Sequence, residues 1–356
     1  MSKSVPDCAD IPINLIHSLR ELQAIMNKKD FRIVFMGTPE FAVASLDKLM
    51  QEGYTIPAVV TAPDKPAGRG KKLTSSAIKQ YAEANGLNVL QPEKLKSEEF
   101  LSELASLKAD LFVVVAFRML PEVVWNMPPK GTINLHASLL PQYRGAAPIN
   151  RVVMNGETET GLTTFFLTHE IDTGNIIAQH RLPICFTENA GDVHDRMMLV
   201  GAELLATTVE QIMLNSYKAI PQSEETNSES ELKHAPKIFK EDCFINWHQP
   251  GLNIYNQIRG LSPYPAAFTE IRGKDTEPYQ LKIFSSTFEP IGVDKEAALK
   301  LLEPGTIVID ERKSMRIAAT DGWIYVKEVQ QQGRKRMLVG DYLRGLAICS
   351  DLKASY

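Results

Sequence analysis

Short apolar runs alternate with amphipathic stretches along the first 140 residues of the chain. Runs of consecutive apolar residues bounded by turn residues are typical of strands that a parallel sheet buries on both faces. Such runs lie at residues 31–37, 56–63 and 110–117, and further strand-like stretches lie at 87–92 and 131–138. Stretches with apolar residues at helical spacing lie between them, at residues 37–53, 75–86 and 97–109. The alternation predicts an α/β fold, with a doubly wound, mainly parallel sheet and helices on both of its faces.

The pattern changes in the second half of the chain. Two apolar runs within residues 160–184 flank the turn sequence Asp-Thr-Gly-Asn and predict two strands. Helical spacing of apolar residues over 189–213 predicts one long helix. A polar stretch rich in Ser and Glu follows, as expected of a linker. Beyond it, closely spaced strand-like runs with turn residues between them predict a small β-barrel or sandwich.

These patterns divide the chain into four parts. We predict an N-terminal extension at 1–30, an α/β domain at 31–220, a linker at 221–234 and a β domain at 235–350. A length of 356 residues suits two domains of ordinary size. The extension either forms a short amphipathic helix or precedes a globular chain that begins near Met26. We assign it no function.

Composition places the chain among soluble globular proteins, with 44% hydrophobic and 23% charged residues. No apolar run approaches the ~20 residues of a membrane span, and residues 1–30 lack the basic start and apolar stretch of a signal peptide. The four cysteines are far apart and form no CxxC pair, which argues against a zinc site or a disulfide framework. We therefore expect a cytoplasmic protein that needs no metal ion.

The formal net charge of −4 gives no overall sign of nucleic-acid binding, so any such contact must come from a local basic patch. One basic patch surrounds two glycines and contains Lys65, Arg69, Lys71 and Lys72. A second is the run Arg334, Lys335 and Arg336. Taken alone, either run is more often a solvated loop than a binding surface.

Motifs for nucleotide binding and hydrolysis are incomplete or absent. Gly37 ends the first strand as the first glycine of a dinucleotide-binding turn does, but the second and third glycines are missing. The stretch AGRGKKLTSS lacks both the leading glycine and the Ser or Thr of a phosphate-binding P-loop. No HExxH or GxSxG sequence is present.

The predicted strand at 131–138 ends with two polar side chains on one face. Asn134 and His136 are two residues apart, so they point in the same direction in a strand. Open α/β sheets bind ligands beyond the carboxyl ends of their strands, which is where this pair lies. Each residue alone more often has a structural role, but together an amide and an imidazole can polarise a carbonyl and move a proton. Asp172, in the downstream turn, is the best candidate to orient the imidazole.

The residues around this pair point to a family. The stretch INLHASLLPQYRGAAP resembles the NxH–SLLPxxRG stretch of the folate-dependent formyltransferases, and the family's acidic partner lies in a downstream DTG sequence that residues 172–174 match. The likeness continues in IVFMGTPEFAVASLDKL, VVTAPDKPAGRGKKL, APKIFKEDCFINW and IRGLSPYPAAFT. The PAGRGKKL loop and the C-terminal strands are similar to those of the branch that formylates methionyl-tRNA.

The resemblance implies roles for individual residues. Three positions match the family's catalytic trio: Asn134, His136 and Asp172. Four match its folate-contacting segment: Ser138, Leu139, Leu140 and Pro141. The basic loop matches an insertion that engages the acceptor end of initiator tRNA, with Arg69, Lys71 and Lys72 as contacts. The C-terminal strands match an OB-like β-barrel that lies along the tRNA, which suits the basic run Arg334, Lys335 and Arg336.

The implied activity is transfer of the formyl group of 10-formyltetrahydrofolate to the α-amino group of methionyl initiator tRNA. We expect the enzyme to act as a monomer, away from membranes and without a metal. One segment departs from the family pattern, because AFRMLP at 116–121 has Arg118 where a Gly is usual and looks one residue shorter. This loop lines the folate pocket in the family, so we expect altered packing there and a retained formyl donor.

Other functions stay open at this point. A formyltransferase acting on an amino sugar shares the core, but the PAGRGKKL loop argues against it. A hydrolase that releases formate from the same folate needs no tRNA surface. A non-enzymatic RNA-binding module is the alternative from another class, and it has no use for Asn134, His136 and Asp172 together.

Overall fold

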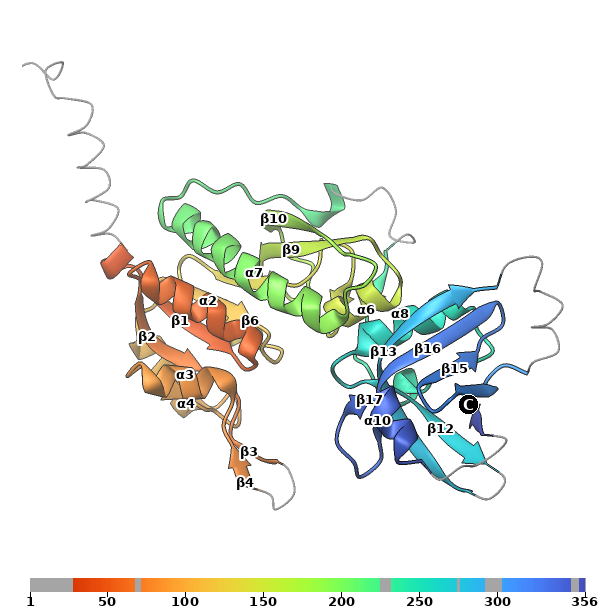
Figure 1. Ribbon diagram of the computed structural model, residues 1–356. Helices are drawn as coiled ribbons and strands as arrows, with labels where there is room; N and C mark the ends of the chain where they lie inside the picture. The colour runs from red at the N-terminus through yellow and green to blue at the C-terminus, as the bar shows by residue number, and fades with distance from the viewer. Residues whose placement is uncertain are drawn as a thin grey trace, which may run out of the picture. The chain divides into compact units, whose positions relative to one another are not determined.

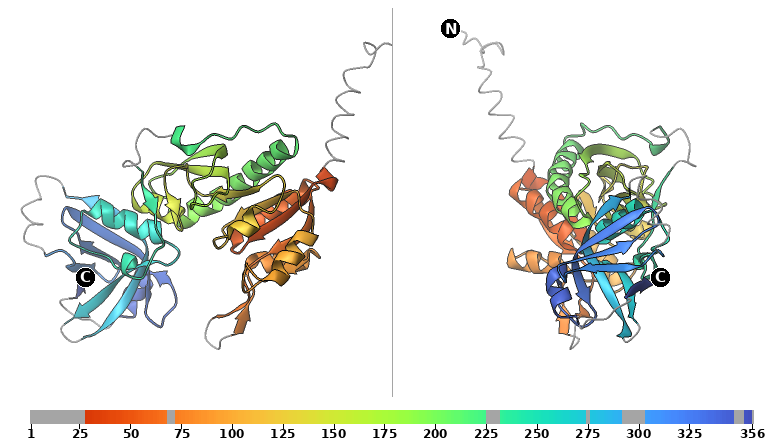
Figure 2. Two further views of the ribbon diagram at one scale, coloured as in Figure 1. Left: turned by 180° about the vertical axis from the view of Figure 1, so that it is seen from behind. Right: turned by 45° about the vertical axis from the view of Figure 1, so that its right-hand side comes forward.

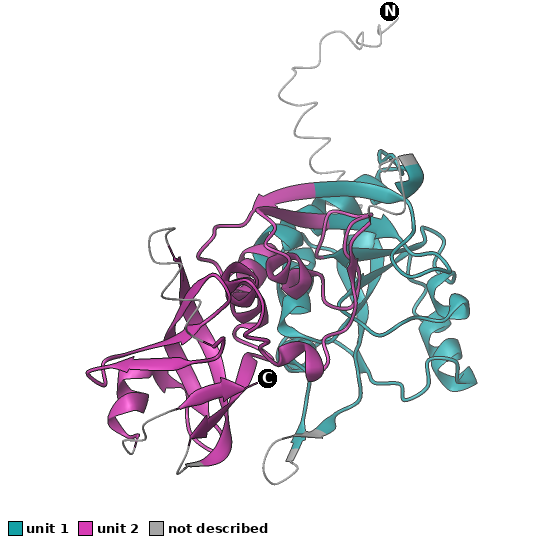
Figure 3. Cartoon of the chain, turned by 90° about the vertical axis from the view of Figure 1, so that its right-hand side faces the viewer, with its two compact units in different colours: residues 1–136, 163–179, 198–225 teal, residues 137–162, 180–197, 226–356 magenta. Residues whose placement is uncertain are grey.

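The chain folds into two compact units in a computed structural model that describes residues 28–67, 72–224, 232–273, 276–291, 303–346 and 352–355 (Figure 3). The predicted N-terminal extension lies almost wholly outside these residues. The first unit comprises Met1–His136, Thr163–Gln179 and Met198–Glu225. The second comprises Ala137–Leu162, His180–Met197 and Thr226–Tyr356. The chain therefore crosses from one unit to the other several times.

A seven-stranded sheet, ordered β10-β9-β7-β6-β1-β2-β5, forms the core of the first unit (Figure 1). Its strands are β1 (Arg32–Gly37), β2 (Thr55–Val60), β5 (Val89–Leu90), β6 (Leu111–Val115), β7 (Thr132–His136), β9 (Glu159–Phe166) and β10 (Ile176–Pro183). The five strands from β7 to β5 pair in parallel, and β9 pairs with β7 in the antiparallel sense. The predicted mainly parallel, doubly wound sheet is confirmed.

Helices cover both faces of this sheet. They are α2 (Glu40–Gln51), α3 (Ala77–Ala84), α4 (Glu98–Ser106), α5 (Glu122–Trp125) and α7 (Ala190–Met213). Phe100 and Leu104 of α4 and Val124 of α5 pack in one apolar cluster with buried side chains from one face of β1, β2 and β6. On the other face α2 and α7 lie side by side, with 2.9 Å between Lys48 Nζ and Glu203 Oε1 (Figure 1).

A short hairpin projects from the first unit between β2 and α3 (Figure 2). Its strands, β3 (Lys65–Ala67) and β4 (Lys72–Thr74), pair in the antiparallel sense. The apolar pattern predicts a strand over residues 56–63 and a loop after it. The strand is present as β2 but ends at Val60. The predicted loop instead contains the two paired strands β3 and β4, which have too few residues to show an alternating pattern.

The second unit contains an antiparallel sheet ordered β14-β15-β16-β13-β12-β18, with β17 paired to β16. Its strands are β12 (Ala267–Gly273), β13 (Thr276–Pro290), β14 (Ile307–Asp310), β15 (Ser314–Ala318), β16 (Gly322–Gln331), β17 (Met337–Leu338) and β18 (Lys353–Ser355). A bridge between Thr306 and Lys353 joins the two ends of this order, so the sheet curls and closes on itself. The predicted small β-barrel is confirmed.

Among its described residues, the second unit also contains three helices and a small two-stranded sheet. The helices are α6 (Pro148–Met154), α8 (Gly251–Leu261) and α10 (Val339–Arg344). Strands β8 (Arg144–Gly145) and β11 (His234–Ala235) pair in parallel. A Cβ added at Gly260 would lie 2.5 Å from Met154 Cγ, so α6 and α8 pack closely. Within the described ranges, no helix combines the length and the hydropathy that crossing a membrane requires.

Candidate active site

Strand β7 places Asn134 and His136 at the carboxyl end of a central strand. Asn134 is in register with Val114 of β6 and Phe165 of β9. The His136 side chain is only 7% exposed. The Asn134 Oδ1 atom is buried and has no hydrogen-bond partner among the described residues. A buried polar atom without a partner is costly in a finished fold, so this oxygen marks a position where a ligand group is expected.

Asp172 lies in the turn between β9 and β10 and faces His136. A distance of 3.8 Å separates His136 Nδ1 from Asp172 Oδ2, and the two side chains are 7% and 11% exposed. Water screens such a pair much less than it screens a surface pair. The backbone of Asp172 is in the left-handed region, with φ at 56°. The structure thus brings two of the three predicted catalytic residues together and carries the third on the same strand.

The Asp172 turn is held by a residue that no sequence pattern singles out. Gln222, in the short 3-10 helix η2 (Gln222–Glu224), is 3% exposed. Its Nε2 donates to the main-chain oxygens of Asp172, at 2.9 Å, and of Gly174, at 2.8 Å. A Cβ added at Gly174 would lie 1.6 Å from the carbonyl oxygen of Phe166, so only glycine fits there. Gln222 stands in the stretch that composition assigns to the linker.

The SLLP segment forms a compact turn in the second unit. Ser138, Leu140 and Pro141 are buried and Leu139 is half-buried. Ser138 Oγ donates to the Gln142 carbonyl oxygen at 2.6 Å, and the Gln142 amide donates to the Leu139 carbonyl oxygen at 2.9 Å. Because most of these side chains serve the turn itself, its contacts with a ligand are expected mainly from the backbone.

The segment that departs from the family pattern follows β6. Ala116 has a left-handed backbone, with φ at 48°. The Arg118 guanidinium donates to the carbonyl oxygens of Pro92 and Glu93, the second at 3.1 Å. Since β6 and β7 are parallel neighbours, this loop begins beside the strand end that carries His136. Arg118 therefore ties a loop at the edge of the site to the connection between β5 and α4.

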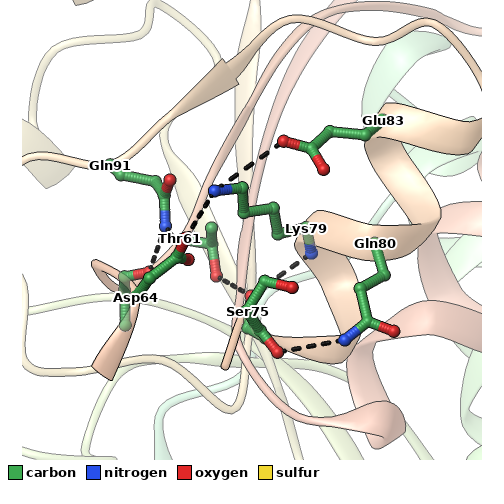
Figure 4. Close-up of polar contacts among 9 residues, drawn as sticks. Thr61, Asp64, Ser75, Lys79, Gln80, Glu83 and Gln91 are labelled. Carbon is green, nitrogen blue, oxygen red and sulfur yellow. Dashed lines mark hydrogen bonds and ion pairs between the residues drawn. The ribbon is translucent and has the colours of Figure 1, made fainter. Parts of the chain in front are cut away.

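Polar side chains fix the base of the β3–β4 hairpin (Figure 4). Asp64 accepts hydrogen bonds from Lys79 Nζ at 2.7 Å and from Gln91 Nε2 at 2.9 Å. Beyond β4, the Ser76 and Thr61 hydroxyl oxygens are 2.9 Å apart. The hydrogen bond from Lys79, followed by that from Gln91, holds the pKa of Asp64 below its usual range. Both ends of the hairpin are therefore anchored to the first unit.

The residues predicted to contact tRNA fall in both units. Arg69 and Lys71 lie outside the described residues, and Lys72 begins β4. The run Arg334, Lys335 and Arg336 is exposed in the turn between β16 and β17. Arg336 pairs with Glu328, and its guanidinium lies 4.5 Å from the centre of the Phe284 ring. Among the described residues, no group of three or more His, Cys, Asp or Glu side chains is arranged to hold a metal ion.

Two family profiles match the regions that carry these features. The profile described as formyl transferase matches residues 31–209, which include β1 to β9 and the pair Asn134 and His136. The profile described as the C-terminal domain of formyl transferase matches residues 237–347. The chain therefore belongs to the formyl transferase family.

Several curated relatives that are similar to this chain over most of its length carry the same name. The methionyl-tRNA formyltransferase of Parabacteroides distasonis is 54% identical over 321 residues, which cover 90% of this chain and 97% of that protein. The methionyl-tRNA formyltransferase of Bacteroides fragilis is 53% identical over 328 residues, covering 92% of this chain and 99% of the relative. That of Porphyromonas gingivalis is 44% identical over 327 residues.

Solved structures share the fold at lower identity. An N-formyltransferase of Helicobacter canadensis, in complex with folinic acid and dTDP-3-aminofucose, is 21% identical and covers 86% of this chain and all of its own, with a TM-score of 0.58. HypX of Aquifex aeolicus, in complex with tetrahydrofolic acid, is 17% identical and covers 91% of this chain and 50% of its own, with a TM-score of 0.58. Both similarities support the fold.

Proposed function

We propose that this chain transfers the formyl group of 10-formyltetrahydrofolate to the α-amino group of methionyl initiator tRNA, giving formylmethionyl-tRNA for translation initiation. The observation that carries the proposal is the buried pair His136 and Asp172 next to the unpartnered Asn134 oxygen. It occurs in a chain that is 54% identical, over 90% of its length, to an enzyme named methionyl-tRNA formyltransferase.

The reaction requires the protein to stabilise charge on the formyl oxygen and to assist a proton transfer. The methionyl amine nitrogen bonds to the formyl carbon, the bond from that carbon to the donor nitrogen breaks, and a proton passes from the amine to the leaving nitrogen. Negative charge develops on the formyl oxygen during the attack. A single hydrogen-bond donor aimed at such an oxygen is typically worth roughly 10²–10³ in rate.

Three residues are assigned to these two functions. His136 donates to the developing oxyanion and takes part in moving the proton. Asn134 donates from its amide nitrogen to the same oxygen, and its unpartnered Oδ1 is free to accept a hydrogen bond from the attacking amine. Asp172, 3.8 Å from His136 Nδ1, holds the imidazole in one tautomer and stabilises the charge that it acquires.

The residues present suit a folate-type formyl donor. The orphaned oxygen of Asn134 lies at the carboxyl end of a parallel strand, where sheets of this class bind ligands. We assign the donor contacts to the turn of Ser138, Leu139, Leu140 and Pro141, which offers main-chain hydrogen-bonding groups and apolar surface for a flat ring.

The acceptor contacts are assigned to the two basic runs. Arg69, Lys71 and Lys72 follow β3 in the sequence, in a basic stretch with two glycines. Cations in such a stretch can reach phosphates without being buried, so these three residues are assigned to the acceptor end of the tRNA. The run Arg334, Lys335 and Arg336 is assigned to a more distant part of the tRNA backbone. We further propose a cytoplasmic, monomeric enzyme that requires no metal.

The test is a competition between acceptors. Purified protein is given 10-formyltetrahydrofolate with methionyl initiator tRNA, an amino sugar nucleotide and water as competing acceptors, and the products are separated by mass. The proposal predicts formylmethionyl-tRNA as the main product. Formylated sugar or free formate as the main product would keep the His136 chemistry and overturn the acceptor.

A further inference from the structure

The chain segment that enters the C-terminal barrel is bonded to the residues that directly follow the turn assigned to the formyl donor. β11 pairs in parallel with β8, which begins three residues after Pro141. The Tyr143 amide donates to the Lys233 carbonyl oxygen at 2.6 Å, and the Lys233 amide donates to Gln142 Oε1 at 2.9 Å. A Cβ added at Gly145 would lie 2.4 Å from the Ala235 carbonyl oxygen, so the two strands touch at this point.

Tyr143 is held in an unfavourable conformation at the end of this turn. Its φ is 60°, which is a left-handed backbone for a bulky residue, and its side chain is buried. Such a conformation is unfavourable and persists only when the surroundings enforce it. The side chain is held at its hydroxyl, which donates to Glu157 Oε1 at 2.5 Å and accepts from Asn155 Nδ2 at 3.0 Å.

Glu157 joins the two segments. Its Oε1 atom accepts both the Tyr143 hydroxyl and the Lys233 ammonium. The Glu157 side chain is 28% exposed and the Lys233 side chain is 54% exposed. Burial acts to raise the pKa of Glu157, but the hydrogen bonds from Lys233 and Tyr143 outweigh it and hold that pKa below its usual range. One carboxylate thus fixes the end of the donor turn and the start of β11 at the same time.

We infer that Glu157 is a positioning residue for the formyl donor, and that Lys233 makes donor affinity depend on the strand that enters the C-terminal barrel. The inference rests on the proposed function in one respect, namely that the turn at 138–141 contacts the donor. Releasing Glu157 frees Tyr143 from its left-handed conformation and loosens the turn. The reacting groups Asn134, His136 and Asp172 keep their places, so the effect falls on donor binding.

Steady-state kinetics with each substrate varied in turn test the inference. In Glu157→Gln and Lys233→Met, KM for the formyl donor rises about 5- to 10-fold, as expected for the loss of one charge-assisted hydrogen bond. KM for methionyl-tRNA and kcat stay within about twofold of the wild type. Lys233→Arg, which keeps the charge and the donors, restores the wild-type KM. In the double variant Glu157→Gln with Lys233→Met, KM for the formyl donor is no higher than in Glu157→Gln alone, because both changes break the same contact between Glu157 and Lys233.

A matched pair in the same unit serves as the control. Lys313 Nζ lies 2.6 Å from Glu311 Oε2 in the exposed turn between β14 and β15. Glu311→Gln and Lys313→Met leave both KM values unchanged. Calorimetric titration with 5-formyltetrahydrofolate measures donor affinity in the same variants without needing turnover.

The outcomes separate this inference from the proposed function. A wild-type protein that binds 5-formyltetrahydrofolate but forms no formylmethionyl-tRNA contradicts the proposed acceptor, while weakened binding in Lys233→Met still supports the positioning role. Unchanged donor affinity in Lys233→Met, or an equal rise of both KM values, would overturn the inference. Lys233 is largely exposed, so its variant keeps the test valid even where Glu157→Gln fails to fold.

Discussion

At the scale of single residues, the chemistry depends on which polar side chains point in the same direction and on which other residues fix their positions. The common face of Asn134 and His136 follows from strand periodicity and was predictable without a structure. Asp172 was a candidate because it is an acidic residue in the downstream turn, and the DTG resemblance strengthened it. No local pattern shows that a turn 36 residues downstream of His136 returns to it. Gln222 was not predictable, because a buried glutamine in a polar stretch gives no signal until the chain is folded.

Gln222 supplies a prediction at this scale. Gln222→Ala removes both hydrogen bonds to the Asp172 turn, so the carboxylate loses its fixed position beside His136. We expect kcat to fall about 10- to 100-fold, the usual cost of a displacement near 1 Å at a reacting group, with both KM values little changed. Gln51→Ala, on the exposed side of α2, is the control. A kcat in Gln222→Ala equal to that of the wild type would show that the Asp172 turn keeps its conformation without the hydrogen bonds from Gln222.

At the scale of elements, long buried runs were predictable and short pairings were not. β1 and β6 are continuous apolar runs, and their burial matches the expectation for parallel strands. β3 and β4 have three residues each, and β8 and β11 have two, which is too short for an alternating pattern. The partner of β8 also lies about 90 residues away, so its pairing follows from tertiary structure alone.

The hairpin base gives a pH-dependent prediction. Asp64 has a lowered pKa because Lys79 and then Gln91 donate to it. A carboxyl with a lowered folded pKa adds stability above its unfolded pKa of about 3.9, and that stability is lost as the pH falls through the folded value. Asp64→Asn therefore lowers the urea midpoint near neutral pH, and its difference from the wild type shrinks below about pH 4.

Urea unfolding across this pH range, with Glu83→Gln as the control, checks the prediction. Glu83 is the outer partner of Lys79, at 3.7 Å, and is more exposed than Asp64. A difference between Asp64→Asn and the wild type that stays constant with pH would show that the carboxylate charge plays no part.

At the scale of the whole molecule, composition and contacts divide the chain in different ways. Composition predicts a boundary at the polar stretch 221–234, and this stays a prediction. Contacts instead group Ala137–Leu162 with the C-terminal residues. The reason lies in contacts between residues distant in sequence, such as Asn150 Nδ2 to the Gly260 carbonyl oxygen at 2.7 Å. Composition does not report such contacts.

Recognition of tRNA gives a prediction at this scale. Arg69→Ala removes one proposed phosphate contact, so KM for methionyl-tRNA rises while donor affinity is unchanged. The slope of log KM against log salt concentration falls by about one, as expected for one lost ionic contact. Kinetics at several salt concentrations measure both effects. Weakened donor binding with normal tRNA kinetics would contradict the role of the basic loop.

The most direct test of the account is single-turnover formylation of methionyl-tRNA by the wild type and His136→Ala, with enzyme in excess and both substrates bound. The account predicts that His136→Ala transfers the formyl group about 10²–10⁴ times more slowly while binding both substrates normally. A single-turnover rate close to that of the wild type would contradict the central claim that the imidazole beside Asp172 carries the chemistry.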